Sequence, residues 1–187
     1  MSDLHLFDDE VLQHGVFRTT LQALSRPGTV QSLPEPAHGE PLLAVLAALL
    51  DVEVGFTVAG ADAQLSERIT RATGSLSVPA ESTAFLVAPD GGSAGLLPQL
   101  PRGVPDYPDR GAMVVYRVAA LRAEGGARSW SGPGIKSSCS PHIEGLGGGE
   151  LESLQKINRD FPLGVDALFV DRGGRVMGLP RTTRIGG

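Results

Sequence analysis

The chain has 187 residues, 41% of them hydrophobic, which is enough apolar material for one sizeable core. We therefore expect a single domain spanning residues 1–187. A formal net charge of -5 and a pI near 5.3 argue against a nucleic-acid-binding protein, because binding to phosphate backbones needs clustered positive charge. The single cysteine, Cys139, excludes an internal disulfide and a cysteine-built zinc site.

The sequence predicts neither export nor insertion into a membrane. The acidic segment 1–10 lacks the basic start and apolar centre of a secretory signal. The most apolar stretch, 41–50, is about half as long as the ~20 residues of a membrane-spanning helix. We therefore expect a cytoplasmic protein that contacts no membrane.

Helices and strands are predicted to alternate along the chain. Apolar residues at helical spacing predict an amphipathic helix over 9–24 that ends at Pro27-Gly28, and a segment apolar on nearly every face predicts a buried helix over 42–50. Further predictions are strands at 52–58, 83–88 and 113–121, helices at 61–72 and 150–160, and a terminal hairpin of 165–170 and 176–179. This order predicts an α/β fold, a layered single domain with a mixed β-sheet.

Two segments give weaker signals. The stretch 90–109 holds four glycines and four prolines, which predicts irregular structure with at most a turn of helix at 94–97. Gly125-Gly126 predicts a tight turn from the strand before it into 128–131, and therefore a second hairpin.

Glycine-rich motifs raise two catalytic or binding hypotheses. Ser93, in Gly-Gly-Ser-Ala-Gly, matches the nucleophile elbow of α/β-hydrolases, but the prolines that follow leave no room for its helix, and we favour a surface loop. The segment 145–149 resembles a phosphate-binding loop before a helix, but Glu150 replaces the last glycine of the motif and no strand is predicted to precede it. We favour a flexible linker, with Glu150 bonded to the amides of its own helix.

Lys136, Cys139 and His142 lie close together in the sequence. Lys136 is a candidate Schiff-base lysine for pyridoxal phosphate, although a solvated loop lysine is the simpler interpretation. Cys139 and His142 suggest a thiolate and its base, but most lone cysteines are small apolar fillers. The four histidines do not fall at the spacing of metal ligands, so we expect no metal site.

An Arg-Thr-Thr triplet, Arg181 to Thr183, follows the last predicted strand. An arginine with two hydroxyls at a strand end could bind a phosphate or phosphonate, with Arg26 as a further contact. The spacing itself favours the alternative that these residues hold the C-terminal tail in place or face a partner protein.

Five segments, taken in order, resemble the H subunit of carbon-phosphorus lyase, the PhnH family. They are 17–28 with its Ser-Arg-Pro-Gly, 49–53, Gly132-Pro133-Gly134-Ile135, 161–166, and Gly178 to Thr183 with its Leu-Pro-Arg-Thr-Thr. The resemblance spans nearly the whole chain, so it implies one PhnH-like domain over 1–187.

The resemblance implies a cytoplasmic bacterial subunit of alkylphosphonate use that is a homodimer when isolated and assembles with the G, I and J subunits. In that system G, H and I, with the L subunit, are associated with displacing adenine from MgATP by the phosphonate, which gives ribose 1-phosphonate 5-triphosphate. The J subunit then breaks the carbon-phosphorus bond with an iron-sulfur cluster and S-adenosylmethionine.

The implied fold is similar to that of pyridoxal-phosphate transferases without the cofactor site. We expect the chain to bind no cofactor alone and to lack autonomous catalysis, with MgATP used by the complex. The alternative is a direct active-site contribution, in which phosphonate or nucleotide phosphate binds Arg26, Arg181, Thr182 and Thr183.

Overall fold

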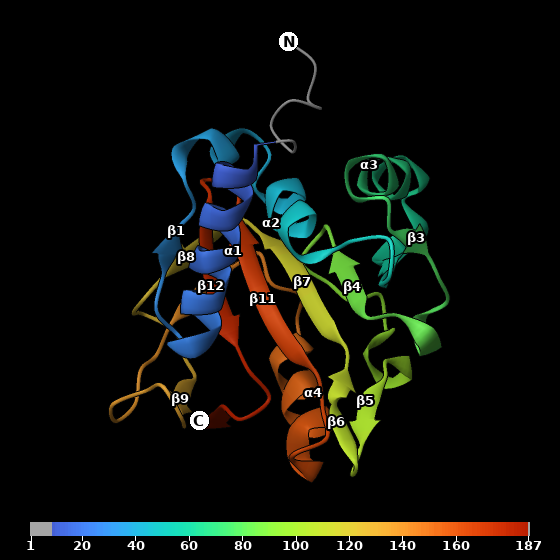
Figure 1. Cartoon of the computed structure of the whole chain (residues 1–187). Helices are drawn as coiled ribbons and strands as arrows, with labels where there is room; N and C mark the ends of the chain where they lie inside the picture. The colour runs from blue at the N-terminus through green and yellow to red at the C-terminus, as the bar shows by residue number, and fades with distance from the viewer. Residues whose placement is uncertain (1–8, 187) are drawn as a thin grey trace.

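A computed structural model describes residues 9–186, in which a seven-stranded sheet forms the centre (Figure 1). The strand order is β1-β12-β11-β7-β4-β2-β3. The five strands from β3 to β11 run parallel, and β12 runs antiparallel to both β11 and β1. The strands are β1 Gln31–Ser32, β2 Gly55–Val58, β3 Leu76–Ser77, β4 Phe85–Ala88, β7 Met113–Val118, β11 Asp166–Asp171 and β12 Arg175–Leu179. The predicted α/β fold with a mixed sheet is confirmed. Most of the acidic segment 1–10, which we do not expect to be a secretory signal, lies outside the described residues.

Helices cover both faces of this sheet (Figure 1). Helices α1 (Glu10–Ser25), α2 (Pro41–Leu49) and α3 (Ala63–Thr73) belong to one buried cluster, and α4 (Glu150–Ile157) belongs to the other. Successive strand residues point to opposite faces, so Val115 packs with the first cluster while Val114 packs with the second. Short 3-10 helices lie at Glu35–Gly39, Ala59–Ala61, Ala80–Ser82, Leu97–Gln99 and Asn158–Asp160.

Short-range signals set the helix ends. The Asp9 carboxylate accepts hydrogen bonds from the amides of Val11 and Leu12, at 3.0 and 3.1 Å, and so begins α1. Asp62 caps α3 in the same way, and Gly74 ends it with a φ of 74°. The predicted helices over 9–24, 42–50, 61–72 and 150–160 are confirmed, the last with its final turn in the 3-10 form.

The terminal hairpin is also confirmed. Strands β11 and β12 pair antiparallel with Leu168 opposite Gly178. Asp171 closes the turn between them, because its carboxylate accepts hydrogen bonds from the amides of Gly173 and Arg175, each 2.9 Å long.

Three predicted strands have different bounds. The strand predicted over 83–88 begins at Phe85. The strand predicted over 52–58 begins only at Gly55, because Asp51 accepts a 2.8 Å hydrogen bond from the amide of Glu53 and forms a turn. The strand predicted over 113–121 is divided into β7 and a second strand, β8 (Ala120–Arg122).

Of the two weak predictions, the first holds for residues 90–101 but not for those that follow, and the second was wrong. The segment 90–109, expected to be irregular, contains β5 (Arg102–Val104) and the start of β6 (Tyr107–Gly111), which pair antiparallel. Its helical turn lies at Leu97–Gln99 and not at 94–97. The hairpin expected around 125–131 does not form: β8 pairs with β10 (His142–Glu144), and β9 (Ser129–Ser131) pairs with β13 (Arg184–Gly186).

Candidate functional site

A hollow of about 750 Å³ lies where three segments meet. The loop after β9, the end of α4 with the turn that follows it, and residues 181–185 form its walls. Its volume falls within the range of small-molecule binding sites. The structure brings together three of the four predicted anion contacts here, Arg181, Thr182 and Thr183. The fourth, Arg26, is exposed at the end of α1 and does not line the hollow.

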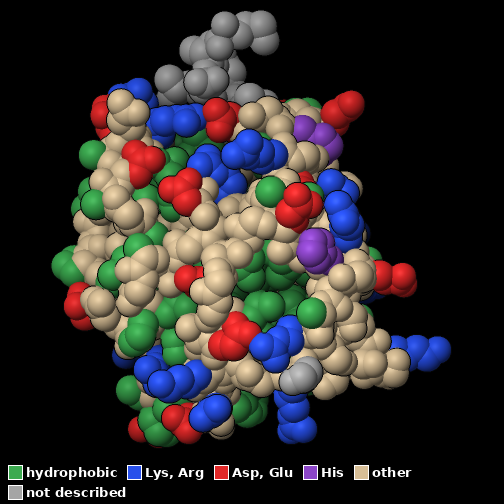
Figure 2. Space-filling model, turned by 180° about the vertical axis from the view of Figure 1, so that it is seen from behind, with side chains coloured by type: hydrophobic (Ala, Val, Ile, Leu, Met, Phe, Trp, Pro, Cys, Tyr) green, Lys and Arg blue, Asp and Glu red, His purple; other side chains and the backbone are tan. Residues whose placement is uncertain are grey.

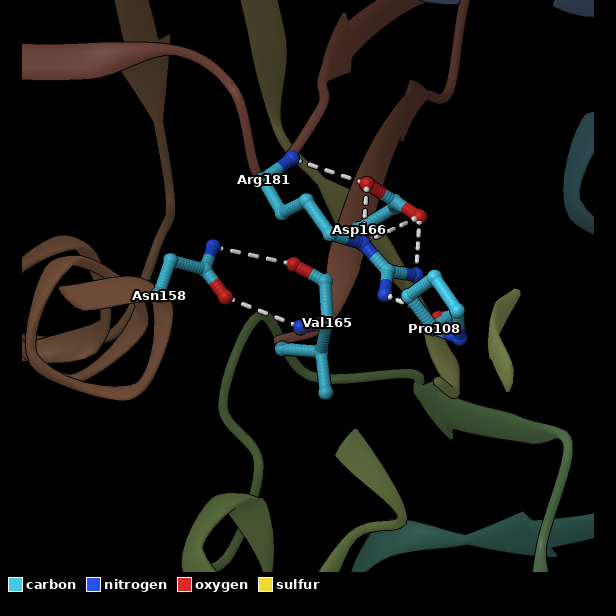
Figure 3. A network of polar contacts seen from close by, with 5 residues as sticks. All are labelled: Pro108, Asn158, Val165, Asp166 and Arg181. Atoms are coloured by element: carbon cyan, nitrogen blue, oxygen red, sulfur yellow. Dashed lines mark hydrogen bonds and ion pairs between the residues drawn. The ribbon is translucent and has the colours of Figure 1, made fainter. Parts of the chain in front are cut away.

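The guanidinium of Arg181 is bound to Asp166, the first residue of β11 (Figure 3). Its Nη2 donates to Oδ2 of Asp166 at 2.6 Å, its Nε lies 3.2 Å from both carboxylate oxygens, and its Nη1 donates to the carbonyl of Pro108 at 2.8 Å. The Arg181 side chain is only 11% exposed and that of Asp166 25%. Arg181 therefore joins the C-terminal segment to β11 and to the β5–β6 hairpin, and its charge is compensated.

Neighbouring residues leave room for this contact and support it. A Cβ at Gly111 would lie 2.5 Å from Nη1 of Arg181, so only glycine fits there without a shift. Asn158, at the end of α4, accepts a 2.8 Å hydrogen bond from the amide of Val165 and donates a 3.0 Å bond to the carbonyl of the same residue (Figure 3). These bonds fix the start of β11, and with it the position of Asp166.

The two threonines differ in their surroundings. Thr182 is partly exposed, and Thr183 is buried in a turn closed by a 2.9 Å hydrogen bond from its amide to the carbonyl of Pro180. The Thr183 hydroxyl oxygen has no hydrogen-bond partner within residues 9–186. Buried hydroxyls are usually satisfied, so this group is an exception in the wall of the hollow.

Sequence reasoning missed three further residues of the hollow, Arg159, Phe161 and Arg184. Phe161 directly follows the predicted helix of 150–160, and its side chain is 61% exposed. Arg184 is adjacent in sequence to the predicted triplet, and its alternation with buried Ile185 is the signal that could have placed it on an exposed strand face. Arg159 has no such local signal.

Ser93 is a buried structural residue and not an exposed nucleophile. The Glu150 carboxylate accepts hydrogen bonds from the amide and the hydroxyl of Ser93, both at 2.9 Å. It accepts a third from the hydroxyl of Tyr116 at 2.7 Å. Burial, together with the hydrogen bond and negative charge of Glu150, raises the pKa of Tyr116 well above its usual range. Glu150 thus joins the start of α4 to the loop of Ser93 and to strand β7, and the expected hydrogen bond to the amides of its own helix was wrong.

The glycine-rich segment 145–149 is held in place on both sides. Strand β10 leads directly into it, contrary to the prediction that no strand would. The amide of Gly147 donates a 2.8 Å hydrogen bond to the carbonyl of Gly91. The segment therefore packs against the loop of Ser93, and the flexible-linker interpretation was wrong.

No hydrogen bond joins Lys136, Cys139 and His142 to one another within residues 9–186. Lys136 is exposed in a loop, and His142 lies in β10 opposite Arg122. The Cys139 thiol lies 3.9 Å from the carbonyl oxygen of Pro27, and burial raises its pKa, which favours the protonated form. Within residues 9–186 no three metal-binding side chains gather, and no helix has the length and apolarity needed to cross a bilayer; His5 lies outside the described residues.

Comparison with known proteins identifies the family of this chain. A family model described as "Bacterial phosphonate metabolism protein (PhnH)" matches residues 6–186. The chain belongs to the PhnH family. A PhnH relative, the "Alpha-D-ribose 1-methylphosphonate 5-triphosphate synthase subunit PhnH" of Rhizobium meliloti (strain 1021), is 30% identical over 189 residues, which cover 96% of this chain and 93% of the relative. The "Putative C-P lyase subunit protein HtxG" of Stutzerimonas stutzeri is 36% identical over 174 residues, which cover 92% of this chain and 85% of that protein.

Segments that carry the PhnH resemblance meet in space. Gly178 of β12 lies directly under α1, since a Cβ there would be 2.6 Å from the carbonyl oxygen of Ala23. The amide of Gly28 reaches the carbonyl of Gly178 at 3.4 Å, and Gly134 lies against the carbonyl of Ser25. The ion pair of Arg181 with Asp166 joins the segment from Gly178 to Thr183 to one further segment, 161–166. These motifs of a PhnH chain thus make the contacts that hold its fold together.

Proposed function

We propose that the chain is a subunit of the carbon-phosphorus lyase core complex that supports transfer of a phosphonate to the ribose of ATP, with release of adenine, and that it has no catalysis of its own. The product of this step is ribose 1-phosphonate 5-triphosphate. Membership of the PhnH family supports the proposal, as do the names of relatives, one a C-P lyase subunit and one a subunit of a ribose phosphonate triphosphate synthase.

The single observation that carries the absence of autonomous catalysis is the state of Ser93. Among the described residues, Ser93 is the side chain that matches the nucleophile-elbow motif. Its hydroxyl is buried and donates a hydrogen bond to Glu150. Lys136 is an exposed loop residue, and burial raises the pKa of the Cys139 thiol, which favours its protonated form. These environments favour a structural role for Ser93 and Cys139 and a solvated loop position for Lys136.

We further propose that the chain is a homodimer in isolation, that it assembles with the G, I and J subunits in the cytoplasm, and that its fold is similar to a pyridoxal-phosphate transferase without the cofactor site. Exposed apolar side chains support the existence of partner surfaces. Val11, Phe17 and Leu21 are exposed on α1, and Val104 and Tyr107 on the β5–β6 hairpin.

A second candidate function is direct binding of phosphonate or nucleotide phosphate. The observation that favours it is the presence of Arg181, Thr182 and Thr183 in one hollow. Of the residues proposed for this role, Arg26 lies elsewhere and Arg181 is already paired, so the binding contacts must be reassigned within the hollow.

Co-expression of an affinity-tagged chain with the G, I and J subunits tests the proposed function. We expect the four proteins to elute together after size-exclusion chromatography. Elution of the tagged chain alone, with the other three assembled without it, would overturn the proposal. Release of adenine from MgATP and methylphosphonate by the purified chain alone would overturn the claim that it lacks catalysis.

A further inference from the structure

We propose that the hollow beside β13 binds the triphosphate of a nucleoside triphosphate, with Arg159 and Arg184 as the anion contacts and Phe161 as the surface for the base. The choice of a ribose 5-triphosphate over other polyanions rests on the proposed function. The assignment of the residues rests on the hollow itself.

Uncompensated positive charge is the first argument. Three arginines line the hollow, Arg159, Arg181 and Arg184, and no aspartate or glutamate is among its lining residues. Arg181 is neutralised by Asp166. Arg159 and Arg184 have no ion pair or hydrogen bond to any side chain within residues 9–186, so their guanidinium groups are available to a ligand.

A second hollow in the same chain shows the contrast. It has a volume of about 320 Å³ and is also lined by three arginines, Arg68 of α3, Arg117 of β7 and Arg172 just after β11. There, however, Glu40 lies 2.8 Å from Arg68, and Asp171 is part of the wall. Basic and acidic side chains are likewise interspersed over the face seen in Figure 2. In a chain with a net charge of -5, a hollow lined by arginine and no acid is a specific feature.

Polar groups of the wall suit a phosphate chain. Thr182 is partly exposed, and the buried Thr183 hydroxyl lacks a partner among the described residues. Arginine forks combined with hydroxyl groups bind phosphate oxygens through short, charge-assisted hydrogen bonds. The volume of about 750 Å³ is large enough for more than one phosphate group.

Phe161 provides the other half of the site. It is a 61% exposed aromatic ring in a hollow whose other lining residues are mainly polar or charged. Nucleobases stack on exposed aromatic rings, and this contribution is independent of the phosphate charge. A ligand with a base at one end and a triphosphate at the other uses both features.

Isothermal titration at low salt, with ATP and with inorganic tripolyphosphate as separate probes, tests this assignment. We expect ATP to bind with a dissociation constant below about 1 mM. The variants R159A and R184A should each weaken both probes by about tenfold, the loss expected for one charge-assisted contact. R184K, which keeps the charge, should retain most of the affinity, and F161A should weaken ATP several-fold while leaving tripolyphosphate unchanged.

The matched control is R18A, which removes an exposed arginine on α1, outside the hollow. It should change neither affinity by more than about twofold. No heat with ATP at millimolar concentration would overturn the inference, and so would R159A and R184A losses no larger than that of R18A. An F161A variant that binds ATP as well as the wild type would overturn the role of the ring.

The two proposals fail separately. A chain that assembles with the G, I and J subunits but binds no ATP contradicts the assigned site and leaves the proposed function intact. A chain that binds ATP through Arg159 and Arg184 but does not assemble contradicts the proposed function and supports the assigned site.

Discussion

Replacing Arg181 with alanine should lower the free energy of unfolding by about 3 kcal/mol, the lower end of the loss expected when one partner of a buried ion pair is removed. Arg181 binds Asp166 through Nε and Nη2 and the carbonyl of Pro108 through Nη1, and its side chain is 11% exposed. The lower end applies because Asp166 is 25% exposed and keeps a 2.8 Å hydrogen bond from the backbone amide at position 181.

Urea denaturation and thermal unfolding measure this effect. For a chain of this size, a loss of about 3 kcal/mol corresponds to a melting temperature lower by roughly 6–12 °C. The control is R184A, which removes an exposed arginine without a partner among the described residues and should change stability by less than about 0.5 kcal/mol. If R181A proves as stable as R184A, the ion pair does not join the C-terminal segment to the sheet and the reasoning is refuted.

Three further predictions concern packing and the Glu150 network. Gly178→Ala should destabilise the chain by about 1–3 kcal/mol in urea denaturation, because the new methyl group would press on the carbonyl of Ala23 and move α1; an unchanged midpoint would contradict this. Glu150→Gln should lower stability by about 1–3 kcal/mol, whereas the control Glu152→Gln, at an exposed pair on the same helix, should lower it by less than about 1 kcal/mol; equal losses would contradict the buried network. The pKa of Tyr116 is higher in the folded than in the unfolded chain, so the stability it contributes is present below about pH 10 and is lost as the pH rises further. Tyr116→Phe should therefore flatten the fall of unfolding free energy above pH 10, and an identical alkaline fall in both proteins would contradict the shift.

Local signals in the sequence predicted the elements that depend on neighbouring residues. Asp9 caps α1 and the left-handed Gly74 ends α3, so each lies next to the helix end that it determines. The apolar periodicity that indicates each helix lies within the helix itself. The terminal hairpin is predictable for the same reason, because its turn and both strands are adjacent in the chain.

Long-range pairing was not predictable from such signals. Turn residues at Gly125-Gly126 indicate a reversal, but they do not specify which strand becomes the partner, and β9 pairs with β13 across more than fifty residues. The Glu150 carboxylate likewise reaches Ser93 and Tyr116 only because the fold places the loop of Ser93 and strand β7 beside the start of α4.

The candidate site was half predictable. The triplet of Arg181 to Thr183 was recognised as a place where an anion could bind, and the structure places all three residues in one hollow. No sequence pattern showed that Asp166 compensates Arg181, or that Arg159 reaches the same hollow from the end of α4. Charge compensation depends on distances between side chains, so it was settled only by the fold.

Adenine release from MgATP and methylphosphonate tests the central claim most directly. It should be measured for this chain alone, for the G, I and L subunits together, and for all four. The account predicts no release by the chain alone and a rate in the full mixture that depends on its presence. Release by the chain alone, or an unchanged rate when the chain is left out, would contradict the account.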